Sequence, residues 1–273
     1  MDAKCSRQAP DDRLRRFRGI AAHDGRTGGR SVLRRADGGR YATICGMKRL
    51  FTLIAGKYDR MNRIMSLGLD IVWRRLAVGG ISLPEKSGIL DLACGTGDFT
   101  AVLAKRWPDA RITGVDLTPA MLDVAKGKVV SENVSFEQGD AVNLEAFPDG
   151  AFELAVCAFG FRNFSDKAKA LSECARVLAP GGRLVVLELF RPRFAVLGFA
   201  VNLWFACTAR LFAGKSAGEY RYLRKSVSGT VSSGAFSGMA ASANFRKERE
   251  RFFFPAATCF VFSKPRDVDG GRA

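Results

Sequence analysis

The sequence contains a single histidine, His23, among 273 residues. Because the rest of the chain has none, histidine catalysis, a Ser-His-acid triad and a His-rich metal site are excluded there. The cysteines are odd in number and form no C-x-x-C pair, so neither a zinc site nor a disulfide framework is indicated; they stand at positions 5, 45, 94, 157, 174, 207 and 259. Cys94, Cys157 and Cys174 have apolar neighbours, as reduced buried cysteines do, and a reducing cytoplasm fits best.

The sequence also lacks a long apolar run. The most apolar stretch, residues 194–209, has 16 residues between Arg193 and Arg210. As a helix it would span about 24 Å, which is short of the ~30 Å hydrocarbon core of a membrane. We therefore expect an apolar insertion near residues 194–213, either as a helix of the core or as an interfacial helix over the mouth of a site. The Arg-rich start of the chain also lacks the apolar segment of a secretory signal.

Charge is plentiful and unevenly placed. The chain has 43 basic and 27 acidic residues, a net charge of +16, and residues 1–46 hold Lys4 and ten arginines against five aspartates. That stretch shows no helical or strand period, so we interpret residues 1–46 as a flexible basic extension and residues 47–273 as one globular domain. Translation starting at Met47 is an equal alternative. A basic chain suits nucleic acid or an anionic membrane surface, but no interleaved basic-aromatic stripe supports the nucleic acid.

The most informative segment is ILDLACGTGDFT at residues 89–100, a buried-looking strand followed by a Gly-x-Gly turn and a helix. Gly95 and Gly97 allow a tight turn and close backbone approach to a ligand, and the helix start would present unpaired amides to it. By itself this pattern is also typical of an ordinary turn. A second strand, however, ends at Asp116, 19 residues beyond Gly97, close to the ~20 expected for an acid that binds a ribose diol.

Two further strands end in polar or small residues. Residues 133–140 end in Asp140, which Ala141 follows, and residues 152–158 end in Ala158. Helices are expected from about residues 98, 118 and 165, the last reaching residue 178, and an N-terminal helical lid over about 48–77. An apolar strand at 183–189 and a hairpin of residues 245–254 and 258–262 complete the set. Strands that alternate with helices predict an α/β doubly wound, mostly parallel, seven-stranded sheet.

The segment from about residue 88 to 189 resembles the class I S-adenosylmethionine-dependent methyltransferases. Four stretches narrow the resemblance to the menaquinone/ubiquinone C-methyltransferase family: YDRMNRIMSLGLDIVW (58–73), FGFRN (159–163), RVLAPGGRLVVLE (176–188) and YRYL (220–223). At four places the chain departs from the family pattern. Asp70 stands at a usual His, Phe190 at a usual Ser and Arg224 at a usual Pro, and the usual Leu-Pro near residues 207–208 is absent.

The resemblance implies a site for S-adenosylmethionine. Its Gly-x-Gly loop would hold the methionine portion, Asp116 the ribose, and Asp140 with the Ala141 amide the adenine; the cofactor residues are Gly95, Thr96, Gly97, Asp116, Asp140, Ala141 and Ala158. For Asp116 a helix cap, and for Asp140 a turn, would be the purely structural role. No metal is expected.

The resemblance also implies C-methylation of a prenylated hydroquinone, demethylmenaquinol or a ubiquinone precursor, by an enzyme in transient contact with the inner membrane surface. A homodimer stays open. For the acceptor we expect the residues Tyr58, Asp59, Asn62, Arg162 and Asn163. Arg162 would hold the quinolate oxygen, and Asp59 or Tyr58 would be the base, although Asp59 could equally cap its helix or pair with a nearby arginine. Methylation of another small or lipid-like acceptor, and a basic nucleic-acid-binding protein on the same fold, remain the alternatives.

Overall fold

The computed structural model describes residues 46, 48–190, 203, 229–253 and 257–266. Most of the expected basic extension, nearly all of the apolar insertion near 194–213, the YRYL stretch and the departures at 207–208 and 224 lie outside these residues. No helix of the described part is both long and apolar enough to cross a membrane.

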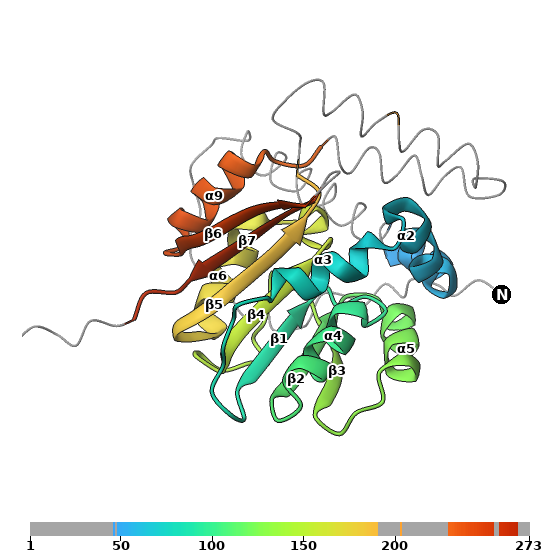
Figure 1. The fold of residues 1–273 in the computed structure, drawn as a ribbon, viewed down its shortest axis with the longest axis horizontal. Coiled ribbons are helices and arrows are strands. Elements are labelled where there is room, and N and C mark those ends of the chain that lie inside the picture. The colour runs from blue at the N-terminus through green and yellow to red at the C-terminus, as the bar shows by residue number, and fades with distance from the viewer. Residues whose placement is uncertain (1–45, 47, 191–202, 204–228, 254–256, 267–273) are drawn as a thin grey trace, which may run out of the picture. The chain divides into compact units, whose positions relative to one another are not determined.

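A seven-stranded sheet forms the centre of the described chain (Figure 1). Its order is β3-β2-β1-β4-β5-β7-β6. The first five strands pair in parallel, and β7 runs antiparallel to both β5 and β6. The strands are β1 Gly88–Leu92, β2 Arg111–Asp116, β3 Val134–Gln138, β4 Phe152–Ala158, β5 Leu178–Glu188, β6 Arg246–Phe253 and β7 Ala257–Ser263. The predicted mostly parallel sheet with a C-terminal antiparallel hairpin is confirmed.

Strand β1 lies at the middle of the parallel part. All five of its residues are buried, and Ile89 pairs with Ile112 of β2 on one side and Leu154 of β4 on the other. A strand covered on both faces is expected to be apolar throughout, as this one is except for Asp91. The first βα turn therefore leaves from the interior of the sheet, where neighbouring strands end beside it.

One boundary differs from the prediction. Strand β5 begins at Leu178, five residues earlier than expected, and the pairing with β4 jumps from Phe152↔Leu178 to Leu154↔Arg183. The Pro-Gly-Gly turn is thus an irregularity inside the strand, because Gly181 adopts a φ of +78° and loops the backbone out of register. The apolar pattern was correct, but a bulge carries no such pattern.

Three predicted helices follow the strands, namely α4 Asp98–Arg106, α5 Pro119–Lys128 and α6 Lys167–Val177. Asp166 caps α6, accepting a bond from the Lys169 amide at 3.0 Å. Thr118 stands at the N-cap of α5 but makes no cap bond through its side chain. A fourth helix, α9 Ser233–Ser242, was not predicted, because its small residues form no clear apolar stripe.

The core lies on both faces of the sheet. One cluster joins the strands to α6 and α9, and the other joins them to α3 and α4, which lie in front of the sheet in Figure 1. Phe190 belongs to the first cluster, with ring centroids 5.0 Å from Phe236 and 5.3 Å from Phe260. The departure from the family pattern at Phe190 is therefore a packing change, since an aromatic ring fills this volume.

The N-terminal segment that we expected to form a lid, called the lid below, is helical. Residues 48–54 are helical and lead through the 3-10 turn η2 Ala55–Lys57 into α2 Tyr58–Ser66 and α3 Leu69–Ala77. Apolar contacts between Ile54, Ala55 and Met121 fix the start of the lid against α5. The end of α3 is held by Arg249 of β6, which donates to the Gly79 and Ala77 carbonyls at 2.9 and 3.1 Å.

Candidate active site

The loop after β1 is organised by the carboxylate at the end of β2. Asp116 accepts the Gly95 amide at 3.0 Å on one oxygen and the Thr118 amide at 2.8 Å on the other. Burial raises the pKa of this carboxyl, while the bonds from Thr118 and Gly95 oppose that rise. Each oxygen keeps a further lone pair, so Asp116 can both hold its loops and accept hydroxyl groups of a ligand.

The two loop glycines have different reasons. Gly97 has a φ of +82°, and a Cβ there would lie 3.2 Å from atoms of Ala125 and Val129, so only glycine lets α4 start this close to α5. Gly95 has a φ of +56°, and no atom lies within 4 Å of the place of its Cβ. The space over Gly95 is therefore open, as backbone approach by a ligand requires.

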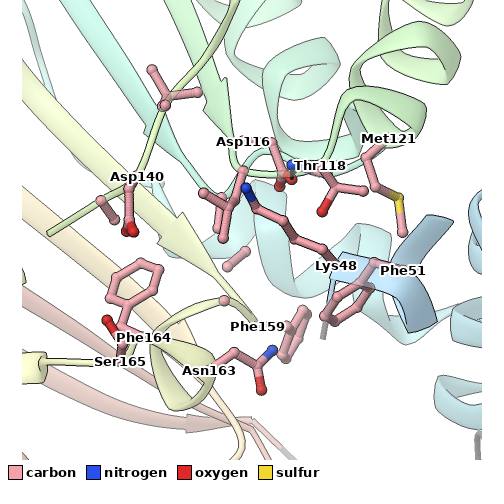
Figure 2. A pocket seen from close by; sticks show the side chains of 18 of the residues that line it. Lys48, Phe51, Asp116, Thr118, Met121, Asp140, Phe159, Asn163, Phe164 and Ser165 are labelled. Atoms are coloured by element: carbon pink, nitrogen blue, oxygen red, sulfur yellow. Dashed lines mark hydrogen bonds between the residues drawn. The ribbon is translucent and has the colours of Figure 1, made fainter. Parts of the chain in front are cut away.

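A pocket with an empty volume of about 810 Å³, its open mouth included, lies at the carboxyl ends of the strands (Figure 2). Seven of the predicted site residues line it, namely Tyr58, Gly95, Asp116, Asp140, Ala141, Ala158 and Asn163. The prediction that strand ends converge on one crevice is confirmed.

On the side expected for adenine, Asp140 combines both of its anticipated roles. One carboxylate oxygen accepts the Val142 amide at 3.1 Å and so forms a turn, while the residue also lines the pocket. Figure 2 shows Asp140 and Asp116 on different sides of the pocket, with Met121 beyond Asp116. An apolar side chain and two separated acids suit a flat base joined to a ribose.

Several lining residues were not predicted: Lys48, Phe51, Met121, Phe159 and Phe164. Lys48 reaches into the pocket from the first lid helix, one turn before Phe51 (Figure 2). The spacing of these two residues on one helical face was a usable signal. Phe159 has a φ of +59°, an unusual value for an aromatic residue, and local sequence gives no sign of such strain.

The residues expected to contact the acceptor surround Tyr58, which lines the pocket. Burial raises the pKa of its phenol, and the charges of Arg162 and Arg74 oppose the rise. Because the net direction is upward, Tyr58 remains protonated at neutral pH. It can therefore donate a hydrogen bond to a ligand oxygen, and the expectation that it acts as a base is not supported.

Arg162 is not among the residues that line the pocket, and it lies behind the lining near Tyr58. Its side chain is 6% exposed, and its Nη1 atom donates to Glu188 Oε1 and to the Phe159 carbonyl, both at 2.6 Å. Glu188 also accepts the Arg162 amide at 3.0 Å, so the 3-10 turn η3 Phe161–Asn163 is fixed to the end of β5. The next residue, Asn163, does line the pocket.

Asp59 and Thr96 face each other instead of the pocket. The Thr96 hydroxyl donates to the Asp59 carboxylate, which is also bound by the Lys128 ammonium. The structure thus corrects the expectation that Asp59 faces the acceptor. Its partners are a residue of the Gly-x-Gly loop and one of α5, and neither is the nearby arginine that we had considered.

Asp59 is one end of a run of alternating charges, here called the charge chain: Arg74, Asp70, Arg63, Asp98, Lys128 and Asp59. Arg74 binds Asp70 at 2.6 Å, and Arg63 binds both Asp70 and, at 2.9 Å, Asp98. Lys128 binds Asp98 at 2.9 Å and Asp59. The charge chain joins α2 and α3 of the lid to α4 and α5, and its second member, Asp70, is buried.

The fold and the site define a class of protein. Solved structures with the same fold include a possible histamine N-methyltransferase from Thermotoga maritima (TM-score 0.57, 22% identity, covering 79% of this chain and 99% of that one). Another is geranyl diphosphate C-methyltransferase from Streptomyces coelicolor (TM-score 0.56, 13% identity, covering 72% and 79%). The acid-bound glycine loop fits the cofactor of this class, and the protein is an S-adenosylmethionine-dependent methyltransferase of class I.

Sequence comparison narrows the class to one family. The chain belongs to the ubiE/COQ5 methyltransferase family, whose model matches residues 41–259. It is 42% identical to a demethylmenaquinone methyltransferase of Thermus thermophilus over 221 residues, covering 79% of this chain and all of that protein. It is 39% identical to the one of Deinococcus radiodurans over 224 residues, covering 80% and 92%. The family resemblance expected from the motifs is confirmed.

Proposed function

We propose that this protein methylates a ring carbon of a prenylated hydroquinone of the demethylmenaquinol type in menaquinone biosynthesis. The observation that carries the proposal is the group of polar residues around Tyr58: the Tyr58 hydroxyl, Asn163 and the nearby charge of Arg162. Tyr58 and Asn163 line the same pocket as Asp116. Relatives at 37–42% identity bear the name demethylmenaquinone methyltransferase. A prenylated benzoquinol, as in ubiquinone synthesis, is the second acceptor to test.

The cofactor supplies a methyl group already activated by its sulfonium. The protein's task is then to hold the acceptor carbon in line with that methyl group and to favour loss of the phenolic proton. A phenol with a pKa near 10 needs only a modest change in environment. Tyr58 as a hydrogen-bond donor, Asn163 in the lining and the charge of Arg162 beneath provide this environment, and the proton passes to water.

The product balance is simple. The ring carbon bonds to the methyl carbon as the methyl–sulfur bond breaks, and the electron pair stays on sulfur. The ring proton at that carbon is then released, which restores the aromatic ring as a phenolate, and the phenolate oxygen takes up a proton from water to give the methylated quinol. One proton leaves for each methyl group transferred, and no metal or oxidant is required.

Contact with an anionic membrane surface is part of the proposal, because a long prenyl tail resides in lipid. The net charge of +16 supports it, as do Leu67, Val72 and Leu76 of the lid, which are 68%, 44% and 42% exposed. We infer a cytoplasmic enzyme peripheral to the inner membrane. Salt-sensitive co-sedimentation with vesicles containing anionic lipid tests this, and equal binding to neutral vesicles would contradict it.

The decisive experiment incubates the protein with methyl-labelled S-adenosylmethionine and each of two quinols, a demethylmenaquinol and a prenylated benzoquinol. We expect label in the ring-methylated menaquinol, identified by mass. Arg75→Met is a suitable control, since Arg75 is exposed on α3 and away from the pocket lining. Absence of methylated product from both quinols, with intact cofactor binding, would overturn the proposal.

A further inference from the structure

Arg74 is a buried cation that the proposed mechanism does not yet use. It is 5% exposed, and its Nη1 atom donates to the side chain of Asp70 at 2.6 Å and to the Asp70 carbonyl at 3.0 Å. Its guanidinium carbon lies 5.2 Å from the centre of the Phe159 ring, which lines the pocket. Arg74 is therefore held from one side by a carboxylate and covered on another by the pocket wall.

Two buried donors near this wall lack acceptors. Among the described residues, Arg74 Nε and Asn62 Nδ2 are buried and have no hydrogen-bond partner. Asn62 lies one helical turn after Tyr58 on α2, and the charge of Arg74 acts on the Tyr58 phenol. Buried donors are nearly always satisfied, so a pair of unsatisfied ones around one pocket residue favours an oxygen acceptor there.

The charge chain places positive charge near Tyr58. Its three cations and three carboxylates cancel in sum, but it ends in Arg74 at the Tyr58 side and in Asp59 at the Gly-x-Gly loop. Around Arg74, α2 contributes Tyr58 and Arg63, α3 contributes Asp70, α4 contributes Asp98, and β1 contributes Asp91. The turn η3 contributes Arg162, which is paired with Glu188 of β5. The positive end thus faces the acceptor and the negative end faces the loop.

Resting on the proposed function, we propose that Arg74 is a positioning residue that stabilises the phenolate form of the acceptor through the wall of Tyr58 and Phe159. Asp70 holds its guanidinium in place. Arg74 is then the second cation, besides Arg162, close to the acceptor oxygen that becomes negatively charged. Its effect lowers the pH at which the bound quinol ionises, by about one unit for a charge several ångströms away at a protein-like dielectric constant.

The first test is the pH profile of turnover. Arg74→Met should move the acid limb of the kcat profile about one unit toward higher pH and lower kcat at neutral pH about tenfold, with the Kd for S-adenosylmethionine changed less than threefold. Arg74→Lys, which keeps the charge, should leave the limb near its wild-type position. Arg75→Met is the matched control, being the same substitution at the next residue of the same helix but on its exposed face.

Asp70→Asn provides a prediction of opposite sign. Removing this carboxylate leaves the charges of Arg74 and Arg63 less compensated, so the acid limb should move toward lower pH. A merely structural role would lower turnover in all variants without moving the limb in opposite directions. Acid limbs that coincide in wild type, Arg74→Met and Asp70→Asn would overturn the proposal.

A binding experiment tests the same idea without turnover. Ionisation of bound 2-naphthol, a ring-sized phenol, can be followed by absorbance with S-adenosylhomocysteine present. The bound phenol should ionise at lower pH in wild type and Arg75→Met than in Arg74→Met, and equal values would refute the role of Arg74. If wild type methylates neither quinol yet shows this Arg74-dependent shift, the proposed function fails while the anion-stabilising wall stands.

Discussion

Asp91 offers a quantitative test of how the centre of the sheet is built. This carboxyl lies on β1 and is 1% exposed, with the Thr100 hydroxyl donating to it at 2.6 Å. Burial raises its pKa from 3.8 to about 7, and the bond from Thr100 opposes the rise. The folded protein therefore holds a proton here that the unfolded chain has already lost between about pH 4 and pH 7.

The sign follows from this difference. A folded-state pKa above the unfolded value means that the contribution of Asp91 to stability is most favourable below about pH 4 and declines as the pH rises to about 7. The full decline is about 4 kcal/mol, and roughly 2–3 kcal/mol of it falls between pH 5 and pH 8. Asp91→Asn resembles the protonated carboxyl at every pH and removes this dependence.

The assay is urea unfolding of the full chain at pH 5 and pH 8. We expect the free energy of unfolding of Asp91→Asn, relative to wild type, to increase by roughly 2–3 kcal/mol between the two pH values, with unchanged m-values. The difference between the two pH values is informative even if the amide itself has a constant cost. Asp123→Asn, on the exposed side of α5, should give parallel curves. Parallel curves for Asp91→Asn as well would refute the reasoning.

Three further outcomes are expected. Asp116→Asn should weaken S-adenosylmethionine binding by about 2–4 kcal/mol, roughly 30- to 1,000-fold in calorimetric Kd, because the ribose hydroxyls lose a carboxylate acceptor. An unchanged Kd in the folded variant, or an equal loss in Asp123→Asn, would contradict this. Gly160→Ala should destabilise the protein by about 1–3 kcal/mol in urea unfolding, since the new Cβ would lie 2.6 Å from that of Ala93. A variant as stable as wild type would show that the backbone moves apart at no cost. Arg249→Met should cost about 1–3 kcal/mol by the same measurement, as two carbonyls at the end of α3 lose a charged donor, whereas a neutral effect would mean that water replaces it.

Periodic features of the sequence predicted the fold well. Buried strands such as β1 and β4 are nearly continuous apolar runs, and the helices between them begin at recognisable residues such as Asp166 and Pro119. Features without a period were missed. Helix α9 has small residues on all sides, and the bulge in β5 depends on how Gly181 meets a neighbouring strand.

The site residues also differ in how far the sequence could predict them. Asp116 and Asp140 could be predicted because strand ends converge at one edge of a parallel sheet, whatever their side chains contact. Asp59 could not, because its direction is decided by Thr96 and Lys128, which lie 37 and 69 residues further along the chain. Lys48 was overlooked because its spacing from Phe51 indicates a shared helical face but does not indicate that this face packs toward α5 and the pocket.

No residue of helix α2 is fully buried, and all but Arg60 are half-buried, among them Tyr58 of the pocket lining. Side-chain bonds from Asp59 and Arg63 to other elements hold it, and such bonds weaken as ionic strength rises. Opening this helix uncovers side chains that are only half-buried, so it can occur without global unfolding. Its amide hydrogens should exchange earlier than those of α3, and faster in high salt. Ligand entry and product release can then proceed through a local fluctuation of one helix while the sheet stays intact.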